Sequence, residues 1–259
     1  MQMKAATYNL RVDTDYDQEW QWHYRSEAVC SLIDYYDWDV LAIQEARPSQ
    51  FADLAKLAQY ASVTAERDGD GLGEGIGLYY QKEAFELLAS GSFWLSLTPT
   101  EPSIHPEAAY SRLCVWAILQ EKKNPPFLAI TTHLDNISEM ARFEGMKVIL
   151  EQLADQIERY PVLLMGDLNA EPTERVHRYL EQHFQNAKEH GQKPHHGPKG
   201  SYQNFIYTLP WQELEEIDYI YTKGFAVVKT ACLTDSYDRR FPSDHFPLEA
   251  EVQFEESKG

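Results

Sequence analysis

Short apolar runs rich in β-branched and aromatic residues recur along the whole chain, and longer stretches with helical spacing separate some of them. Runs of this kind are typical of strands. The pattern predicts ten strands, at 4–10, 40–44, 75–80, 87–95, 112–119, 127–133, 162–166, 217–221, 227–233 and 248–252. It also predicts four helices, at 24–36, 49–59, 138–160 and 173–184. Strands interspersed with helices favour a layered α/β protein with mixed sheets.

The stretch at 138–160 has the clearest helical pattern. Its apolar residues, from Met140 to Ile157, follow one another at intervals of three and four. Ser138 is placed to cap the first turn, and Pro161 follows the last residue. We therefore expect a helix that buries one stripe.

The segment at 190–200 is rich in Gly, Pro and His, which predicts a mobile surface loop. Its three histidines, His190, His195 and His196, could bind a metal. The intervening Gly and Pro residues leave them no fixed geometry, so a solvated loop is the preferred interpretation. No linker divides the chain, and we expect a single domain over residues 1–259.

The composition is that of a globular protein, but the charge is unusual. Lys and Arg number 23 and Asp and Glu number 41, which gives a formal net charge of −18. Binding to nucleic acid or to an anionic membrane relies on a surplus of Lys and Arg, so a broad surface of that type is not favoured. No membrane-spanning segment is expected, since no apolar stretch is long enough.

The cysteines and the start of the chain predict a cytoplasmic location. Cys30, Cys114 and Cys232 lie far apart in apolar or helical patterns, which indicates buried free thiols of a reducing compartment. No signal-like segment precedes the first predicted strand. The oligomeric state is left open.

Six of the apolar runs end abruptly in amide, carboxylate or imidazole side chains. Each ending alone could be a turn residue, a helix cap or a core histidine. Ligands of open α/β sheets bind outside the strand ends, so six such endings together favour one site. The endings are Tyr8-Asn9, Ile43-Gln44-Glu45, Thr132-His133-Leu134-Asp135, Met165-Gly166-Asp167-Leu168-Asn169, Ile217-Asp218-Tyr219 and Ser243-Asp244-His245.

These residue types suit one kind of chemistry. Carboxylates and amides are hard oxygen ligands, and without a cysteine pair or a helical HExxH motif the expected metal is Mg²⁺ or Mn²⁺. Histidines beside such a site could stabilise charge that builds up on phosphorus. An adjacent Asp could take the proton of an attacking water. The pattern therefore predicts metal-assisted hydrolysis of a phosphate ester.

In their order along the chain, the six segments resemble the motifs of the endonuclease/exonuclease/phosphatase superfamily. That superfamily includes deoxyribonuclease I, abasic-site endonucleases, inositol-polyphosphate 5-phosphatases, neutral sphingomyelinases and deadenylases. The most specific motifs are Gly166-Asp167-Leu168-Asn169-Ala170 and Ser243-Asp244-His245-Phe246-Pro247-Leu248. Two further segments are similar to a bacterial branch, Phe93-Trp94-Leu95-Ser96 and Pro102-Ser103-Ile104-His105-Pro106. The resemblance implies a four-layered α/β sandwich, with two mixed sheets face to face and helices outside.

The resemblance also implies roles for the metal and for the attacking water. Glu45 would hold the divalent cation, and Asn9 and Asp244 would complete or support its coordination shell. Asp167 would orient or deprotonate the water. Asn169 would bind the scissile phosphate, and Asn9 would also face the substrate.

The remaining roles concern charge. His133 and His245 would stabilise the transition state, and Asp218 would fix the ring of His245 in the required tautomer. Arg112 begins a strand whose counterpart in several members brings a cation or tyrosine to the phosphate. A salt bridge at the strand edge is an equal alternative for Arg112.

The departures from the superfamily pattern concern the substrate. No basic recognition loop is evident, and the acidic, aromatic segment at 13–24 could wall a pocket, or Trp20 and Trp22 could anchor it on the core. The segment at 200–205 could form an opposite wall or be buried. The preferred function is a Mg²⁺-dependent phosphoesterase for a small or flexible substrate. The alternatives are a nuclease on DNA or RNA and a non-catalytic binding module of the same fold.

Overall fold

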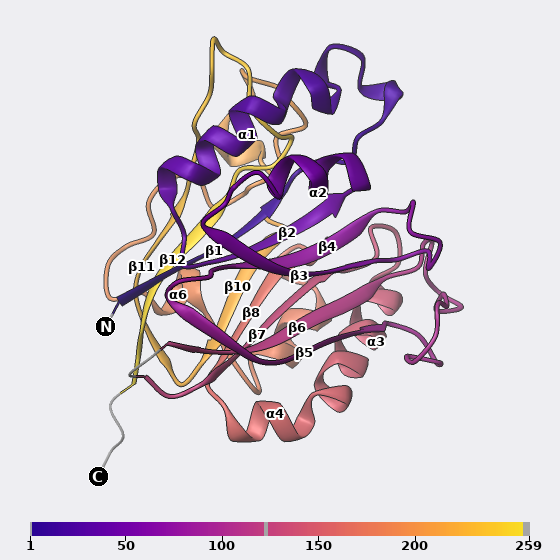
Figure 1. The fold of residues 1–259 in the computed structure, drawn as a ribbon, viewed down its shortest axis with the longest axis vertical. Helices are drawn as coiled ribbons and strands as arrows, with labels where there is room; N and C mark the ends of the chain where they lie inside the picture. The colour runs from indigo at the N-terminus through magenta and orange to yellow at the C-terminus, as the bar shows by residue number, and fades with distance from the viewer. Residues whose placement is uncertain (1, 122–123, 256–259) are drawn as a thin grey trace.

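Two mixed six-stranded sheets face each other, and helices cover their outer faces (Figure 1). This computed structural model describes residues 2–121 and 124–255. Sheet A contains, in spatial order, β11 (Phe225–Cys232), β12 (Leu248–Phe254), β1 (Gln2–Asn9), β2 (Val40–Ala46), β4 (Gly75–Gln81) and β3 (Tyr60–Glu66). Sheet B contains β5 (Phe85–Trp94), β6 (Leu113–Glu121), β7 (Phe127–His133), β8 (Val162–Asp167), β10 (Asp218–Lys223) and β9 (Gln185–Asn186).

The longer helices lie on the outside of the two sheets. Sheet A is covered by α1 (Trp22–Tyr36) and α2 (Pro48–Leu54), and sheet B by α3 (Glu139–Gln152), α4 (Ala154–Arg159) and α5 (Arg175–Leu180). Shorter helical pieces are η1 (Asp15–Trp20), α6 (Ala187–His190) and η2 (Trp211–Glu213). In the described part of the chain, none of the helices has the length and apolar character needed to cross a bilayer.

Apolar side chains fill the three interfaces between these four layers. One cluster lies between the sheets and includes Val115, Phe127 and Phe225. A second joins sheet B to its helices, and a third joins sheet A to α1 and α2. Burial of this apolar surface is the main stabilising term of such a fold. The expected four-layered α/β sandwich is confirmed.

Each sheet has one parallel pair of strands near its centre, β1 with β2 and β7 with β8. In the first pair Asn9 lies opposite Gln44, and in the second His133 lies opposite Asp167. Because parallel strands end at the same edge of their sheet, four of the polar endings meet at two points. The two parallel pairs pack across the interface between the sheets, which brings the two points together.

Several element boundaries differ from those predicted. Strand β3 was not predicted, because its sequence Tyr-Ala-Ser-Val-Thr-Ala-Glu contains no apolar run and only Tyr60 of this edge strand is buried. The helix predicted at 138–160 has its cap at Ser138, as expected, but a break at Leu153, whose φ of −107° and ψ of 15° are not helical, divides it into α3 and α4. The helices predicted at 49–59 and 173–184 are shorter, since tight turns follow Leu54 and Leu180.

The segment at 190–200 is a largely exposed loop, as expected for a surface loop, and its backbone is tied to β11. The amide of His196 donates to Thr230, and the amide of Cys232 donates to the carbonyl of His196. His195 is fixed between the Thr230 hydroxyl and the carbonyl of Pro198. Within residues 2–121 and 124–255, the segment's histidines belong to no group with metal-ligand geometry.

The cysteines agree with the expectation of free thiols. Cys30, Cys114 and Cys232 form no disulfide. Cys114 and Cys232 are buried, whereas Cys30 is only half-buried.

Candidate active site

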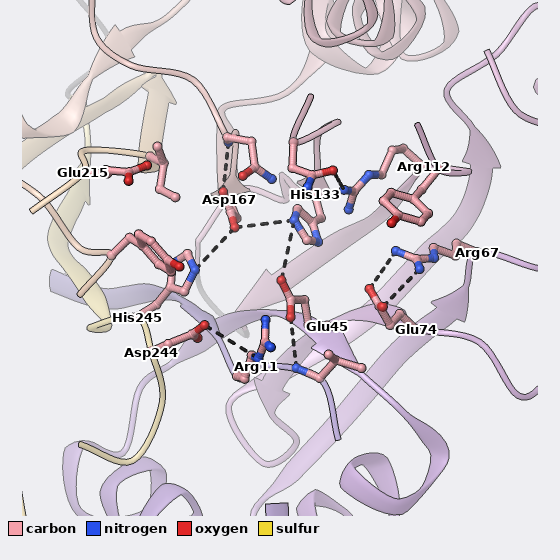
Figure 2. A pocket seen from close by; sticks show the side chains of 16 residues that line it. Arg11, Glu45, Arg67, Glu74, Arg112, His133, Asp167, Glu215, Asp244 and His245 are labelled. Atoms are coloured by element: carbon pink, nitrogen blue, oxygen red, sulfur yellow. Dashed lines mark hydrogen bonds and ion pairs between the residues drawn. The ribbon is translucent and has the colours of Figure 1, made fainter. Parts of the chain in front are cut away.

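A pocket of about 470 Å³ opens where the two parallel pairs end, and its walls come from both sheets (Figure 2). Most of the predicted site residues line it: Glu45, Arg112, His133, Asp167, Asn169, Asp244 and His245. Asn9 and Asp218 lie behind them and are joined to them by hydrogen bonds. Gln44 points elsewhere, since its side chain is buried and bonds Thr7 and Thr131.

Sheet A places Glu45 through an irregularity that the sequence does not reveal. The pairing of β2 with β4 shifts register between Ile43 and Ala46, and Glu45 has a left-handed backbone with φ of 62°. Such a bulge re-aims a side chain, and a non-glycine residue in this conformation is strained. The Val12 amide donates to Glu45 Oε2 at 2.9 Å, which holds the re-aimed carboxylate in place.

Asn9 holds two carboxylates together. Its Nδ2 donates to Glu45 Oε1 at 3.0 Å and to Asp167 Oδ2 at 2.9 Å. Its Oδ1 is turned away and accepts from the Arg11 amide at 2.9 Å. In this arrangement Asn9 is a donor to the carboxylates, and its amide oxygen, the atom that could bind a metal, faces Arg11.

Sheet B places Asp167 at the end of β8, directly after Gly166. A Cβ on Gly166 would lie 2.0 Å from the carbonyl oxygen of Thr132, so only glycine permits this approach of β8 to β7. Asp167 is almost fully buried, and burial together with the charge of Asp218 raises its pKa to about 7.

His133, from the neighbouring strand β7, faces both carboxylates. Its Nε2 lies 3.5 Å from Asp167 Oδ2 and 3.9 Å from Glu45 Oε1. Burial and the charges of Arg112 and His245 hold the pKa of His133 well below its usual value. This imidazole is therefore neutral at pH 7 and can offer a lone pair.

Glu45, His133 and Asp167 each offer one ligand atom, and these atoms lie within 4.8 Å of one another. The two carboxylates suit Mg²⁺ or Mn²⁺, which bind through one or two carboxylate oxygens and keep several waters, whereas an imidazole is a ligand that softer cations prefer. The residues present therefore fit the expected metal. Asp244 lines the same pocket, but its Oδ2 lies 3.8 Å from Arg11 Nε, and it stands outside this group of ligand atoms.

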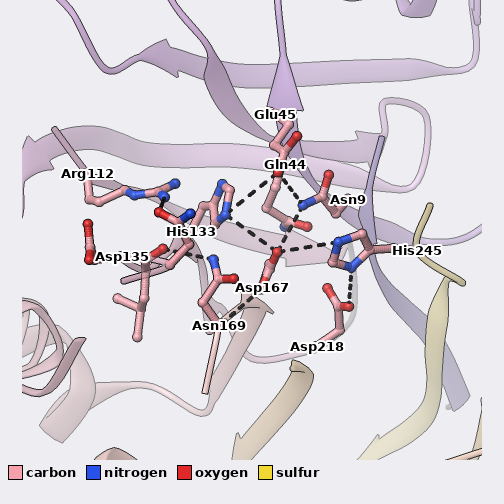
Figure 3. A network of polar contacts seen from close by, with 12 residues as sticks. Asn9, Gln44, Glu45, Arg112, His133, Asp135, Asp167, Asn169, Asp218 and His245 are labelled. Carbon is pink, nitrogen blue, oxygen red and sulfur yellow. Dashed lines mark hydrogen bonds and ion pairs between the residues drawn. The ribbon is translucent and has the colours of Figure 1, made fainter. Parts of the chain in front are cut away.

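His245 and Asp218 form a buried pair on the other side of Asp167 (Figure 3). His245 Nδ1 lies 2.7 Å from Asp218 Oδ2, which also accepts from the Ser201 hydroxyl at 2.6 Å. Burial alone would lower the pKa of His245, but the charge and hydrogen bond of Asp218 outweigh it and raise this pKa to about 10. His245 is thus a cation, and its Nε2 lies 3.8 Å from Asp167 Oδ2.

Asn169 follows Asp167 in a tight, left-handed turn with φ of 47°. Its backbone amide donates to Asp167 Oδ1 at 2.9 Å. Its side-chain Nδ2 donates to the carbonyl of Leu134 at 3.1 Å, which fixes the amide on the pocket wall.

Arg112 is buried in the pocket wall without a carboxylate partner. It is 7% exposed, and among the described residues its side chain has one hydrogen bond, from its terminal nitrogen to Asn136 Oδ1 at 3.2 Å, and no ion pair. Burial and the charge of Arg67 lower its pKa. The strand-edge salt bridge considered for Arg112 is not formed in the described residues, and its remaining N–H donors are free for an anion.

Sequence reasoning missed several residues of the wall: Arg11, Arg67, Glu74, Tyr110, Asn136 and Glu215. They lie in the connections outside the named strands, where the pattern of apolar and polar residues does not show which side chains share a pocket. The segment at 13–24 is anchored by Trp22, which is buried, and Trp20 stacks on Phe205 at 4.5 Å between ring centres. The segment at 200–205 contributes Tyr202 to the pocket.

The model of the Endonuclease/Exonuclease/phosphatase family matches residues 6–245. The chain belongs to this family. The nucleases and phosphatases that give the family its name are hydrolases of phosphate esters. No curated protein matches the chain.

Solved structures agree with the family. A conserved protein of unknown function from Enterococcus faecalis is 56% identical, with a TM-score of 0.95, over 98% of this chain and 100% of that chain. A mannosyl-6-phosphatase from Bacteroides thetaiotaomicron is 27% identical, with a TM-score of 0.91, over 97% and 100%. The human Nocturnin catalytic domain, solved with bound sulfate, is 19% identical, with a TM-score of 0.77, over 98% and 95%, and shares the fold.

Proposed function

We propose that the chain is a phosphoesterase that depends on Mg²⁺ or Mn²⁺ and hydrolyses small or flexible phosphate esters by attack of water on phosphorus. The observation that carries the proposal is the convergence, in one pocket, of the two carboxylates of Glu45 and Asp167, two histidines of which His245 is cationic, and an arginine that has no counterion among the described residues. These are the groups that a reacting phosphoryl dianion requires.

Glu45 would hold the divalent cation, supported by Asn9, and Asp244 would complete or support the shell from the opposite wall. A bound divalent cation would supply positive charge to the phosphoryl oxygens. Asn9 contributes by holding the carboxylates of Glu45 and Asp167 at hydrogen-bond distance from a single nitrogen. Both carboxylates also line the pocket.

Asp167 would orient the attacking water and take its proton. A pKa of about 7 matches such a base to neutral pH, because the base is then partly ionised and still basic enough to accept a proton. Asn169 would position the scissile phosphate from the turn after Asp167.

His245 and His133 would stabilise the transition state. The cationic His245 can neutralise charge on the phosphoryl oxygens, and its bond to Asp218 fixes Nδ1–H toward the carboxylate and Nε2–H toward the pocket. Arg112 would bind a phosphoryl oxygen as the counterion that it lacks within the described residues. The water oxygen becomes part of the phosphate, and the alcohol leaves.

Two further observations support a small substrate and a cytoplasmic enzyme. The net charge of −18 does not favour a long polyanion such as DNA, although charge reversal by a cation can act locally. The cysteines are unpaired, as in a reducing compartment. A binding module without activity would not need Glu45, Asp167, Asn169 and His245, which this chain retains together.

The test is hydrolysis of an aryl phosphomonoester and an aryl phosphodiester, alongside plasmid DNA and single-stranded RNA, with Mg²⁺ present. We expect turnover of at least one aryl ester, intact nucleic acids, and loss of turnover in excess chelator. Equal rates in chelator would refute the metal requirement. Cleavage of plasmid or RNA at a rate comparable to that of the aryl esters would refute the small-substrate proposal and favour a nuclease.

A further inference from the structure

One end of the pocket is built differently from the catalytic centre. Arg67, Glu74 and Tyr110 line it, next to Arg112. Figure 2 shows Arg67 and Glu74 across the pocket from His245. These residues come from the ends of β3 and β4 and from the connection between β5 and β6, so none belongs to the family motifs that mark the centre.

Arg67 and Glu74 form a closed ion pair. The two terminal nitrogens of Arg67 donate to the two oxygens of Glu74 at 2.7 and 3.0 Å. Their side chains remain 15% and 18% exposed, and the two residues line the pocket. Together they present N–H donors and carboxylate acceptors side by side with no net charge.

Tyr110 connects this pair to Arg112. Its ring centre lies 5.0 Å from the Arg67 guanidinium and 5.9 Å from that of Arg112, and the residue is 49% exposed. Such a ring offers apolar surface beside the polar groups. Only Arg112, of the two arginines, lacks a carboxylate in the described residues.

Arg67 has a carboxylate partner and Arg112 has none in the described residues, so the two ends of the pocket suit different parts of a substrate. A phosphoryl group suits Arg112, whose charge is not compensated. A second anionic group would gain little at the other end, because the charge of Arg67 is already compensated by Glu74 and Arg67 Nε also lies 3.7 Å from Asp68 Oδ1. An alkyl or lipid chain would remove water from the exposed part of the ion pair without offering it a hydrogen bond, which is costly. A hydroxyl group both donates and accepts, and so matches a neighbouring carboxylate and guanidinium.

We propose that the Arg67–Glu74 pair and Tyr110 form a subsite for a hydroxyl-rich alcohol, so that the substrate is a phosphomonoester of a sugar or similar polyol. The subsite determines specificity, and it rests on the phosphoesterase activity proposed above. The phosphoryl group lies at the catalytic centre and the hydroxylated ring lies over Tyr110, with its hydroxyls bonded to Arg67 and Glu74.

The test compares two esters with similar leaving groups. The first is the best of three hexose 6-phosphates, and the second is cyclohexylmethyl phosphate, which has a six-membered ring and a primary phosphate but no hydroxyls. A hydrogen bond to a charged group corresponds to about tenfold or more in an equilibrium. We therefore expect the wild-type kcat/KM for the hexose phosphate to exceed that for the cyclohexyl ester by at least about tenfold.

Two variants remove the subsite in different ways. Arg67→Met removes the donors, and Glu74→Gln keeps an acceptor oxygen but removes the charge. Each should lower the ratio of the two kcat/KM values by about tenfold or more. The matched control is Glu251→Gln, which breaks the ion pair with Lys229 at the pairing of β11 with β12, outside the pocket, and should leave the ratio unchanged.

The outcomes separate this inference from the proposed function. If both esters are hydrolysed with equal kcat/KM, the polyol subsite is refuted and the phosphoesterase stands. The same conclusion follows if nucleoside monophosphates are preferred to every hexose phosphate, or if the ratio is unchanged in both variants. If neither these esters nor an aryl phosphate is hydrolysed, the proposed function fails as well.

Discussion

Two of the cavities in the described part of the molecule are similar in size, and they differ in whether their polar side chains have hydrogen-bond partners within the protein. The pocket at the strand ends has a volume of about 470 Å³, and a second cavity beside α5, α6 and β10 has about 440 Å³. Both contain histidines, carboxylates and basic residues. Volume and composition therefore do not distinguish them.

In the second cavity the buried polar side chains bond to the protein itself. His177 Nδ1 lies 2.8 Å from the Tyr221 hydroxyl, and its Nε2 lies 3.1 Å from the carbonyl of Ala170. Lys188 pairs with Glu216 at 2.7 Å and also donates to two backbone carbonyls. These groups have the partners that stability requires.

In the pocket at the strand ends, several polar groups have no such partner. The Arg112 side chain has one hydrogen bond and no ion pair among the described residues, and directly behind the pocket Asp218 Oδ1 is buried without a hydrogen-bond partner in the same part of the chain. Glu45 and Asp167 lie side by side with one amide between them. Because unsatisfied or like-charged buried groups are costly, they indicate a site that is completed by a ligand. The two cavities therefore differ in the number of polar side chains that lack a partner, which is why we propose the function for the pocket at the strand ends.

Removal of the Asp167 charge should have the largest effect. Asp167→Asn cannot accept the proton of water, so kcat should fall by on the order of 10²-fold or more. Stability should fall little, since the asparagine is isosteric and the burial cost of a charge is removed. Steady-state kinetics with an aryl phosphate and urea unfolding measure the two quantities. Wild-type turnover in this variant would contradict the role of Asp167.

Asp218→Asn should have the next largest effect. The variant removes the charge that keeps His245 protonated, and it allows the imidazole to adopt the wrong tautomer. We expect kcat to fall by about 10²-fold, with a smaller change in KM, because the bond acts on the transition state rather than on binding. A large rise in KM at unchanged kcat would show that Asp218 serves binding instead.

Arg112→Met tests whether a buried side chain without a carboxylate partner in the described residues serves activity and not stability. The variant loses the proposed phosphoryl contact, so kcat/KM should fall by roughly 10-fold to 100-fold. It should not lower the unfolding free energy, because the buried guanidinium has no counterion in the described residues to lose. A marked loss of stability would show that Arg112 is a structural residue.

His177→Phe gives the smallest expected effect on activity and tests the second cavity. It keeps the shape of the ring but leaves the Tyr221 hydroxyl and the Ala170 carbonyl without their partner. The free energy of unfolding should fall by about 1–3 kcal/mol, and kcat should stay at the wild-type value. Loss of activity in a stable variant would assign a function to the second cavity.

The sequence was sufficient to predict that His133 and Asp167 lie side by side. The polar endings at His133 and Asp167 follow apolar runs, and the rule that parallel strands end at one edge brings them together. The helix cap at Ser138 was also predictable from the sequence, since capping is a local interaction.

Features that depend on tertiary structure were not predictable. The left-handed backbone of Glu45 arises from a register shift between two strands that are distant in sequence. Arg67 and Tyr110 lie in turn-rich segments with no periodicity, so only the folded chain reveals that they share a pocket. The break at Leu153 leaves no signal in an otherwise regular helical pattern.

Calorimetric titration of Mn²⁺ tests most directly which of the two cavities binds the metal. The titration uses three proteins: wild type, Glu45→Gln and His177→Phe. If the pocket at the strand ends is the metal site and the second cavity is not, wild type and His177→Phe will bind the cation with the same affinity. Glu45→Gln will bind it at least about tenfold more weakly, since a carboxylate ligand is lost. Equal binding by wild type and Glu45→Gln, or loss of binding in His177→Phe alone, would contradict the account.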